Sequence, residues 1–385
     1  MKPIERVEEV RGRAREIATS VVAEDAARED REGAWPERSL RALSDAGLTA
    51  LHVPRDLGGH ELGLEALVVA CEEIGRESPS AALCFGMHCV ATAVIAAKAT
   101  DHQRERYLEP IGAGKHLTTL ALSEPGTGSH FWIPETELQA NGDEYILRGT
   151  KSFITNGGHA DSYVLSVAGV EAGGGEGTFS CVVVDAGSEG MEWQDEWVGF
   201  GMRGNSSRAV ELRDVPVPQG NLLGEAGDQL WYTFEVVTPF FLSAMAGTYL
   251  GVAVEAVEVA RDHVGGRRHS HTGELIGSDP VVGMRLGEMW LEMERTRQLI
   301  YSGARAGDAK KGDALLSILG AKAAAGDTSV FLANEAMTLS GGRGYAEQGK
   351  LTRLLRDARA SHVMAPTTDQ LKQWIGRALL GLPLV

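Results

Sequence analysis

The 385-residue chain has few cysteines and no excess of positive charge, and these shortages exclude several classes of protein. Cys71, Cys84, Cys89 and Cys181 form no CxxC pair and have no histidines at metal-ligand spacing, so we expect reduced core thiols and no metal site. With a net charge of −16, the chain lacks the positive footprint that nucleic-acid binding needs. It also lacks a run of eighteen apolar residues and is charged from its start. We therefore predict neither a membrane span nor a signal peptide, and a cytoplasmic location.

Hydrophobic periodicity divides the chain into three parts. Apolar residues recur at helical steps in the first part, where helices are expected at 3–31, 36–46, from 64 onward and at 81–97. The period then becomes two, with strands expected at 117–123, 145–155, 162–168, 178–185 and 208–213 and a glycine-rich loop at 169–177. After residue 224 the helical period returns, at 227–264, 280–306, 314–339 and 368–380.

These patterns predict an α+β multidomain fold. We expect an N-terminal α-helical domain (1–116), a middle antiparallel β domain (117–222) and a C-terminal four-helix bundle (223–385). The strands are expected to be antiparallel because no helix separates them to carry a parallel crossover. His88, on the apolar helix at 81–97, is expected to be a buried, hydrogen-bonded histidine, with a place in a substrate tunnel as the alternative.

Two segments in the middle part contain the residues from which we predict a ligand-binding site. Residues 120–130 read Leu-Ala-Leu-Ser-Glu-Pro-Gly-Thr-Gly-Ser-His, and residues 149–156 read Gly-Thr-Lys-Ser-Phe-Ile-Thr-Asn. The glycines at 126 and 128 let backbone N–H groups approach a polar or anionic ligand, because no Cβ stands in the way. Strand geometry would place Phe153 and Thr155 on one face.

This pair of segments resembles the acyl-CoA dehydrogenase family, in which they hold FAD. The resemblance implies that Leu122 and Ser123 lie near the flavin ring edge, that Ser129, after Gly128, lies near the pyrophosphate, and that Phe153 and Thr155 lie against the isoalloxazine. An exposed turn followed by an ordinary half-buried strand is the alternative.

A second family signature, Gly-Gly-Arg-Gly-Tyr, stands at 341–345. The resemblance implies that Gly341, Gly342 and Gly344, together with Arg267, contact the FAD of a neighbouring subunit, so that the protein is at least a homodimer and the family's homotetramer is expected. The glycines could instead serve only to break a helix. Where the family has Gln before this turn, the chain has Thr338.

The chain departs from the family at the catalytic base. The family's Tyr-Glu-Gly-Thr segment aligns with 364–367, so Thr367 takes the place of Thr and Ala365 takes the place of the catalytic Glu. Some members carry this carboxylate on the first helix of the C-terminal domain, where the chain has Phe241 and the nearest carboxylate, Glu235, lies nearly two turns away.

Two other residues are candidates for the missing base. His130 follows the first motif and titrates in a useful range, and Asp369 follows the altered segment. For each, an ordinary structural role is the alternative: a loop hydrogen bond for His130 and a first-turn helix charge for Asp369. The bulky Phe131 and Trp132 stand where the family prefers small residues.

The resemblance implies a FAD-dependent oxidoreductase that acts on the CH–CH group of an acyl thioester bound to CoA or a carrier protein. An electron-transfer flavoprotein or oxygen would accept the electrons. Three other interpretations stay open because of the missing glutamate: a flavin-dependent monooxygenase or other redox tailoring enzyme, a base-less partner subunit of a hetero-oligomer, and a scaffold that has lost FAD.

Overall fold

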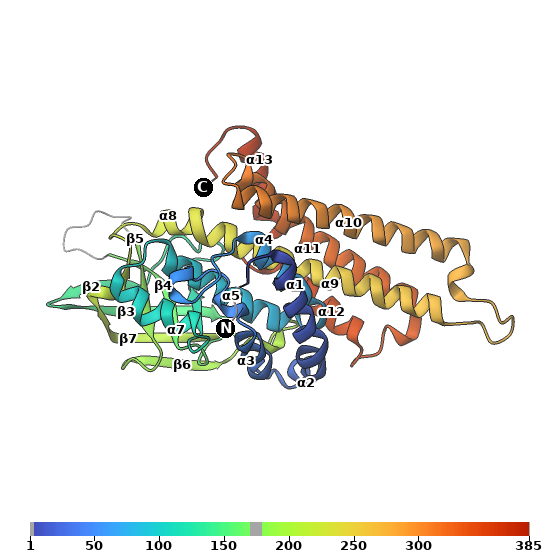
Figure 1. Ribbon diagram of the computed structural model, residues 1–385, viewed down its shortest axis with the longest axis horizontal. Helices are drawn as coiled ribbons and strands as arrows, with labels where there is room; N and C mark the ends of the chain where they lie inside the picture. Colours follow the sequence, from blue (N-terminus) through green and yellow to red (C-terminus); the bar gives the residue numbers. More distant parts are fainter. Residues whose placement is uncertain (1–3, 170–178, 385) are drawn as a thin grey trace.

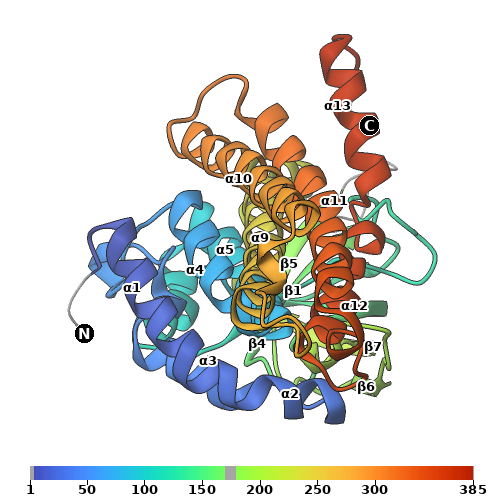
Figure 2. The same ribbon diagram turned by 90° about the vertical axis from the view of Figure 1, so that its right-hand side faces the viewer.

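The computed structural model describes residues 4–169 and 179–384, in which helices flank one mixed sheet. Figures 1 and 2 show the sheet at one end of the molecule, with the N-terminal and C-terminal helices packed side by side. The three-part α, β, α order is confirmed. The glycine-rich loop expected at 169–177 lies, apart from residue 169, outside the described residues.

The N-terminal helices are α1 (Val7–Ile17), α2 (Ala23–Glu32), α3 (Glu37–Asp45), α4 (Leu64–Glu77), α5 (Pro79–Ala97) and the short α6 (Asp101–Gln103) and α7 (Glu109–Gly112). A π-helical turn at Ala18–Val22 joins α1 to α2, so the long helix expected at the start is continuous but not regular. The side chains of α5 are buried over nearly its whole length, as its apolar sequence requires. Periodicity did not predict α6 and α7.

The sheet has the order β6-β7-β3-β2-β4-β5-β8, and β1 pairs with β4 off this path. Its strands are β1 (Thr118–Ala121), β2 (Glu137–Asn141), β3 (Glu144–Ile154), β4 (Ser162–Ala168), β5 (Phe179–Asp185), β6 (Met191–Glu196), β7 (Arg208–Pro218) and β8 (Leu222–Leu223). The expectation of a purely antiparallel sheet is wrong, since β1 and β2 both pair with β4 in parallel. The chain between β1 and β4 is long enough to cross over without a helix, because it contains the β2–β3 hairpin.

The C-terminal helices are α8 (Gln229–Trp231), α9 (Thr238–Gly266), α10 (Pro280–Asp308), α11 (Ala314–Ser340), α12 (Lys350–Val363) and α13 (Thr368–Leu379). A π-helical segment, Tyr232–Val237, leads into α9. The far end of α9, the connection at 267–279 and the start of α10 extend away from the sheet, and we call this part the arm (Figure 1). Helix α12 is an element that periodicity did not predict.

Three helices are long and apolar enough to cross a membrane by length and composition alone: Pro79–Ala97, Gln229–Gly266 and Ala314–Arg343. In the first two, 89% and 83% of the apolar window is buried inside the protein, whereas in the third only 56% is. The first two are therefore core helices of this fold. The third has an apolar face that the described residues leave partly uncovered.

Candidate active site

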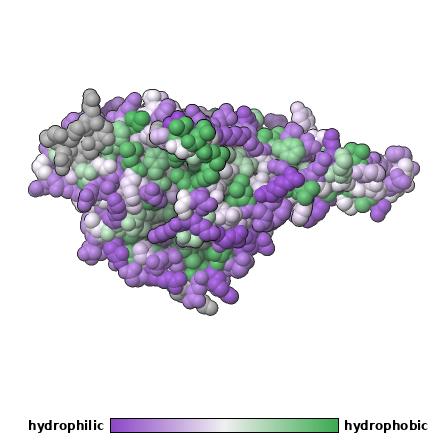
Figure 3. Space-filling model, turned by 90° about the horizontal axis from the view of Figure 1, so that it is seen from above, coloured by the Kyte–Doolittle hydropathy of each residue, from purple (hydrophilic) through white to green (hydrophobic). Residues whose placement is uncertain are grey.

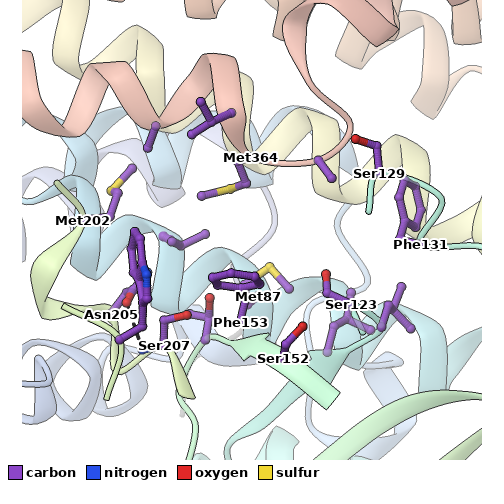
Figure 4. A pocket seen from close by; sticks show the side chains of 18 of the residues that line it. Met87, Ser123, Ser129, Phe131, Ser152, Phe153, Met202, Asn205, Ser207 and Met364 are labelled. Atoms are coloured by element: carbon purple, nitrogen blue, oxygen red, sulfur yellow. Dashed lines mark hydrogen bonds between the residues drawn. The ribbon is translucent and has the colours of Figure 1, made fainter. Parts of the chain in front are cut away.

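A cavity of about 710 Å³ lies where the middle part meets the C-terminal helices. One wall comes from the loop after β1 and from the end of β3, and the opposite wall from α12 and the turn that follows it. Figure 4 shows Met202, Asn205 and Ser207 at one end, Ser129 and Phe131 at the other, and Phe153 and Met87 between them. The lining is mostly apolar and aromatic, as is usual for sites that bind organic ligands.

The structure brings six of the predicted cofactor residues together on this cavity: Leu122, Ser123, Gly128, Ser129, Phe153 and Thr155. Phe153 does not follow regular strand geometry, because it has a φ of +52° at a shift in the β3–β7 register, and Thr155 lies just beyond β3. The Phe153 side chain stays 61% exposed and packs edge-on against Trp197. A non-glycine residue held at positive φ stores strain, and such strain gathers at ligand sites.

A buried ion pair fixes this wall from behind. Lys151, fully buried in β3, donates to the carboxylate of Glu124 and to the carbonyl of Ser166 at 2.6 Å. The Glu124 carboxylate also accepts the backbone N–H groups of Glu135 and Thr136, at 2.6 and 3.1 Å. Burial opposes its ionisation, but the ammonium and these donors together hold the pKa of Glu124 below its usual value. The Glu124 carboxylate therefore serves to hold the loop after β1 in place.

The opposite wall carries no free carboxylate among the described residues. Ala365 lines the cavity between Met364 and Pro366, and Phe241 lines it from α9. Of the described lining residues, only Glu124, Arg356 and Arg359 are ionisable. Both positions at which the family resemblance predicts a base are thus apolar, and both line the same cavity.

The two residues predicted to replace the base, His130 and Asp369, do not line the cavity. His130 is exposed, has its Nδ1 3.3 Å from the Thr127 carbonyl, and packs edge-on against Trp132. Asp369 is exposed in the first turn of α13. Neither is among the lining residues, so each stays a prediction without support from this geometry.

The second set of predicted residues lies in two segments, one in the arm and one between α11 and α12. Arg267 directly follows α9, and Gly341, Gly342 and Gly344 form the turn between α11 and α12. Burial and then the charges of Arg267 and Arg343 lower the pKa of His263, so both segments approach the same histidine. None of these residues lines the cavity. Thr367 adjoins the cavity-lining Pro366, and its Oγ1 accepts the Gln370 N–H at 3.2 Å, which caps α13.

Sequence reasoning missed three side chains that shape the site. Lys151 and Lys322 are fully buried lysines behind opposite walls, and the buried Ser152 Oγ on the cavity wall has no hydrogen-bond partner among the described residues. A lone lysine in the apolar run Ala-Lys-Ala-Ala-Ala at 321–325 was the available signal for Lys322. His88 is a structural residue: its Nδ1 accepts the Thr118 N–H at 3.1 Å and its Nε2 lies 2.9 Å from the Thr49 carbonyl.

Comparison with known proteins decides the family. The model of the acyl-CoA dehydrogenase N-terminal domain matches residues 5–115, that of the middle domain matches 119–215, and that of the C-terminal domain matches 243–380. The chain belongs to the acyl-CoA dehydrogenase family. The predicted class, a FAD-dependent oxidoreductase of CH–CH groups in acyl thioesters, is therefore confirmed.

Individual relatives of this acyl-CoA dehydrogenase family member are distant but span its whole length. Cyclohex-1-ene-1-carbonyl-CoA dehydrogenase of Geobacter metallireducens is 29% identical over 95% of this chain and 96% of its own. Butyryl-CoA dehydrogenase of Megasphaera elsdenii superposes with a TM-score of 0.92 at 23% identity, covering 99% of both chains, which shows the shared fold. The prolyl acyl carrier protein oxidase AnaB superposes with a TM-score of 0.85 at 25% identity, covering 97% of this chain and 98% of its own.

The cavity fits a flavin on its own chemistry. The exposed ring of Phe153 and the apolar lining offer stacking surface, and the unpartnered Ser152 Oγ offers a buried hydrogen-bonding group. Gly128 has a φ of +55° and open space around its Cβ position, so its backbone can approach a ligand closely.

Proposed function

We propose that the protein binds FAD in the 710 Å³ cavity and oxidises the Cα–Cβ bond of an apolar acyl thioester there. The observation that carries this proposal is the meeting of the six motif residues and the 364–366 turn on one cavity. Bound FAD would supply the hydride acceptor. Phe153 and Thr155 would lie against the ring system, Leu122 and Ser123 would lie at its edge, and Gly128 and Ser129 would hold the pyrophosphate.

The proton acceptor is the unassigned part of this proposal. Glu124 is bonded to Lys151 and to two backbone N–H groups. At the two positions predicted for the base, the described lining has Ala365 and Phe241, neither of which can accept a proton. His130 and Asp369 remain the candidates named from the sequence, and either would have to move to reach the cavity. A positioned base is worth about 10²–10⁴-fold in rate, so its absence strongly affects the reaction.

The same absence favours a second candidate function. A flavin-dependent monooxygenase reacts through oxygen and needs no α-proton base, so the apolar residues at 241 and 365 would not impair it. This alternative predicts that bound flavin ignores acyl thioesters and that the reduced protein consumes oxygen. A partner subunit that lacks the base would, on its own, neither oxidise an acyl thioester nor consume oxygen.

Assembly and partners are also part of the proposal. Arg267 in the arm and residues 341–344 in the turn between α11 and α12 do not line the chain's own cavity, which suits contact with the FAD of a second copy in a homodimer or homotetramer. Hydrophobic patches interrupt the hydrophilic surface of the narrow projecting end in Figure 3. In the first half of α10, Val281, Met284 and Trp290 are exposed. Because one relative acts on an acyl carrier protein, CoA and carrier-protein thioesters are both candidate substrates. Electron-transfer flavoprotein or oxygen would be the acceptor, in the cytoplasm.

The visible spectrum of the purified protein tests this function. We expect an oxidised FAD spectrum that bleaches when a medium-chain acyl-CoA is added without oxygen. FAD that stays oxidised with CoA and carrier-protein thioesters alike would contradict the dehydrogenase function, and oxygen uptake by the reduced protein would then support the monooxygenase.

A further inference from the structure

Lys322 on α11 is a fully buried ammonium whose hydrogen bonds among the described residues go only to carbonyl oxygens. Its Nζ donates to the backbone carbonyls of Ser361 at 2.8 Å, Pro366 at 2.9 Å and Met364 at 3.4 Å. Within residues 4–169 and 179–384 no carboxylate forms an ion pair with it, although the chain carries a large excess of acidic residues. Burying a charge without a partner of opposite charge is costly, so an apolar residue of equal size would be expected if the space only had to be filled.

The three carbonyls belong to the end of α12 and to the turn behind the cavity. Helix α12 ends at Val363, and the last carbonyls of a helix have no partners within it, so a cation placed there is favourable. Met364 and Pro366 flank Ala365, and all three residues line the cavity. A single side chain thus ties the helix end to both sides of the residue that stands at the position of the family's base.

The surroundings leave this turn few other restraints. The Met364 N–H bonds to the Ala360 carbonyl at 2.9 Å, and Thr367 then caps α13. Pro366 has no N–H to donate. On the side away from the cavity, Lys322 supplies the hydrogen bonds that hold Met364 and Pro366.

We propose that Lys322 is a positioning residue: its ammonium fixes the 364–366 turn and thereby sets the shape of the cavity wall against which ligands bind. This inference rests on the proposed ligand cavity and adds to it a residue that touches no ligand. A lysine that only capped α12 would affect stability without changing the cavity.

Lys322→Met tests the proposal, with Thr328→Val as the matched control. Thr328 is also buried on α11, and its Oγ1 bonds to Thr296 at 2.7 Å rather than to the 364–366 turn. We expect K322M to raise amide hydrogen exchange at 362–367 by about tenfold or more relative to T328V, because hydrogen bonds from a charged donor are lost. Exchange in α5, on the other side of the cavity, should match in both variants.

A double-mutant cycle separates positioning from stability. Ala365→Glu places a carboxylate on the same turn, and its effects on FAD affinity and on the visible circular dichroism of bound FAD should differ according to whether Lys322 or the K322M substitution is present. Effects of coupled residues are not additive, whereas A365E and T328V should combine additively. If K322M does not fold, K322Q replaces it, because a glutamine retains two N–H donors and should give an intermediate result.

The outcomes are distinct from those of the functional test. Hydrogen exchange needs no substrate, so it decides the role of Lys322 even if acyl thioesters never reduce the flavin. Unchanged exchange at 362–367, or additive effects of K322M and A365E, would overturn the proposal. Raised exchange with non-additive effects would support it.

Discussion

The two walls of the cavity are each held by a buried lysine, but with different partners. Lys151 behind the β3 wall is neutralised by Glu124, whereas Lys322 behind the α12–α13 turn bonds to carbonyls. The first wall carries the motif residues that resemble the acyl-CoA dehydrogenase family, and the second carries Ala365 at the position where that resemblance predicts the base. Each wall is therefore anchored by a lysine that does not itself line the cavity. The cavity-lining side chain at position 365 can therefore change while Lys322 still anchors the backbone on both sides of it.

The largest expected effect is a gain at the second wall. Ala365→Glu should raise flavin reduction by an acyl-CoA by about 10²-fold or more, because a positioned base contributes about 10²–10⁴-fold. Anaerobic stopped-flow absorbance measures this rate, with Ala365→Gln as the uncharged control. No gain over the control would mean that a base elsewhere already serves the reaction or that the wall is shaped for other chemistry.

At the first wall we expect a loss of stability. Lys151→Met should lower the free energy of unfolding by about 3–5 kcal/mol, because it leaves the Glu124 carboxylate buried and without its cation. Urea denaturation checks this value. The double variant K151M/E124Q should lose less, since a neutral amide leaves no buried charge and its oxygen can still accept one of the two N–H groups of Glu135 and Thr136. Equal losses in both variants would show that the charge pair is not what anchors this wall.

A smaller effect is expected outside both walls. His130→Ala removes an edge-on contact with Trp132, whose ring centroid lies 5.2 Å away, and should cost about 1 kcal/mol of stability. Flavin reduction should change only a few-fold, as it should for Asp369→Asn. A loss of more than about a hundredfold in one variant, with FAD still bound, would identify that residue as the base and show that the walls rearrange on binding.

An effect of a different kind, on the pH dependence of stability, is expected behind the second wall. Burial lowers the pKa of Lys322 to about 7, against about 10.4 in an unfolded chain. Between these values the unfolded chain binds more protons, so the free energy of unfolding should rise with pH from about 7 to about 10. Lys322→Met should remove this rise, which urea denaturation at several pH values measures for both proteins. An identical slope in the two proteins would show that Lys322 keeps its proton throughout.

The residues that line the first wall were more predictable from the sequence than the residues that support the two walls. Motif spacing found the residues from Leu122 to Thr155 because that wall is built from two short continuous segments. It missed β2, β6 and α12, whose apolar residues are too few for a clear period, and it missed the parallel pairing of β1 with β4. Pairing depends on contacts between distant segments, which local patterns do not contain.

The two buried lysines that support the cavity walls also bond to residues that are distant in the sequence. Lys151 reaches Glu124 from 27 residues away, and Lys322 reaches Ser361 and Pro366 from 39 and 44 residues away. In the sequence both look like ordinary lysines, since burial is a property of the packed fold. The positive φ of Phe153 could not be predicted from the sequence either. It arises from a shift in the β3–β7 register and not from the type of residue.

The proposed contact between the arm and a second copy would make the retention of FAD depend on the concentration of the protein. If the arm of one copy completes the FAD site of another, association of subunits and binding of FAD share one equilibrium, and each stabilises the other. Diluting the protein should then release flavin from chains that are still folded, and added FAD should restore the assembly. The concentration of the protein itself would become one of the determinants of its activity.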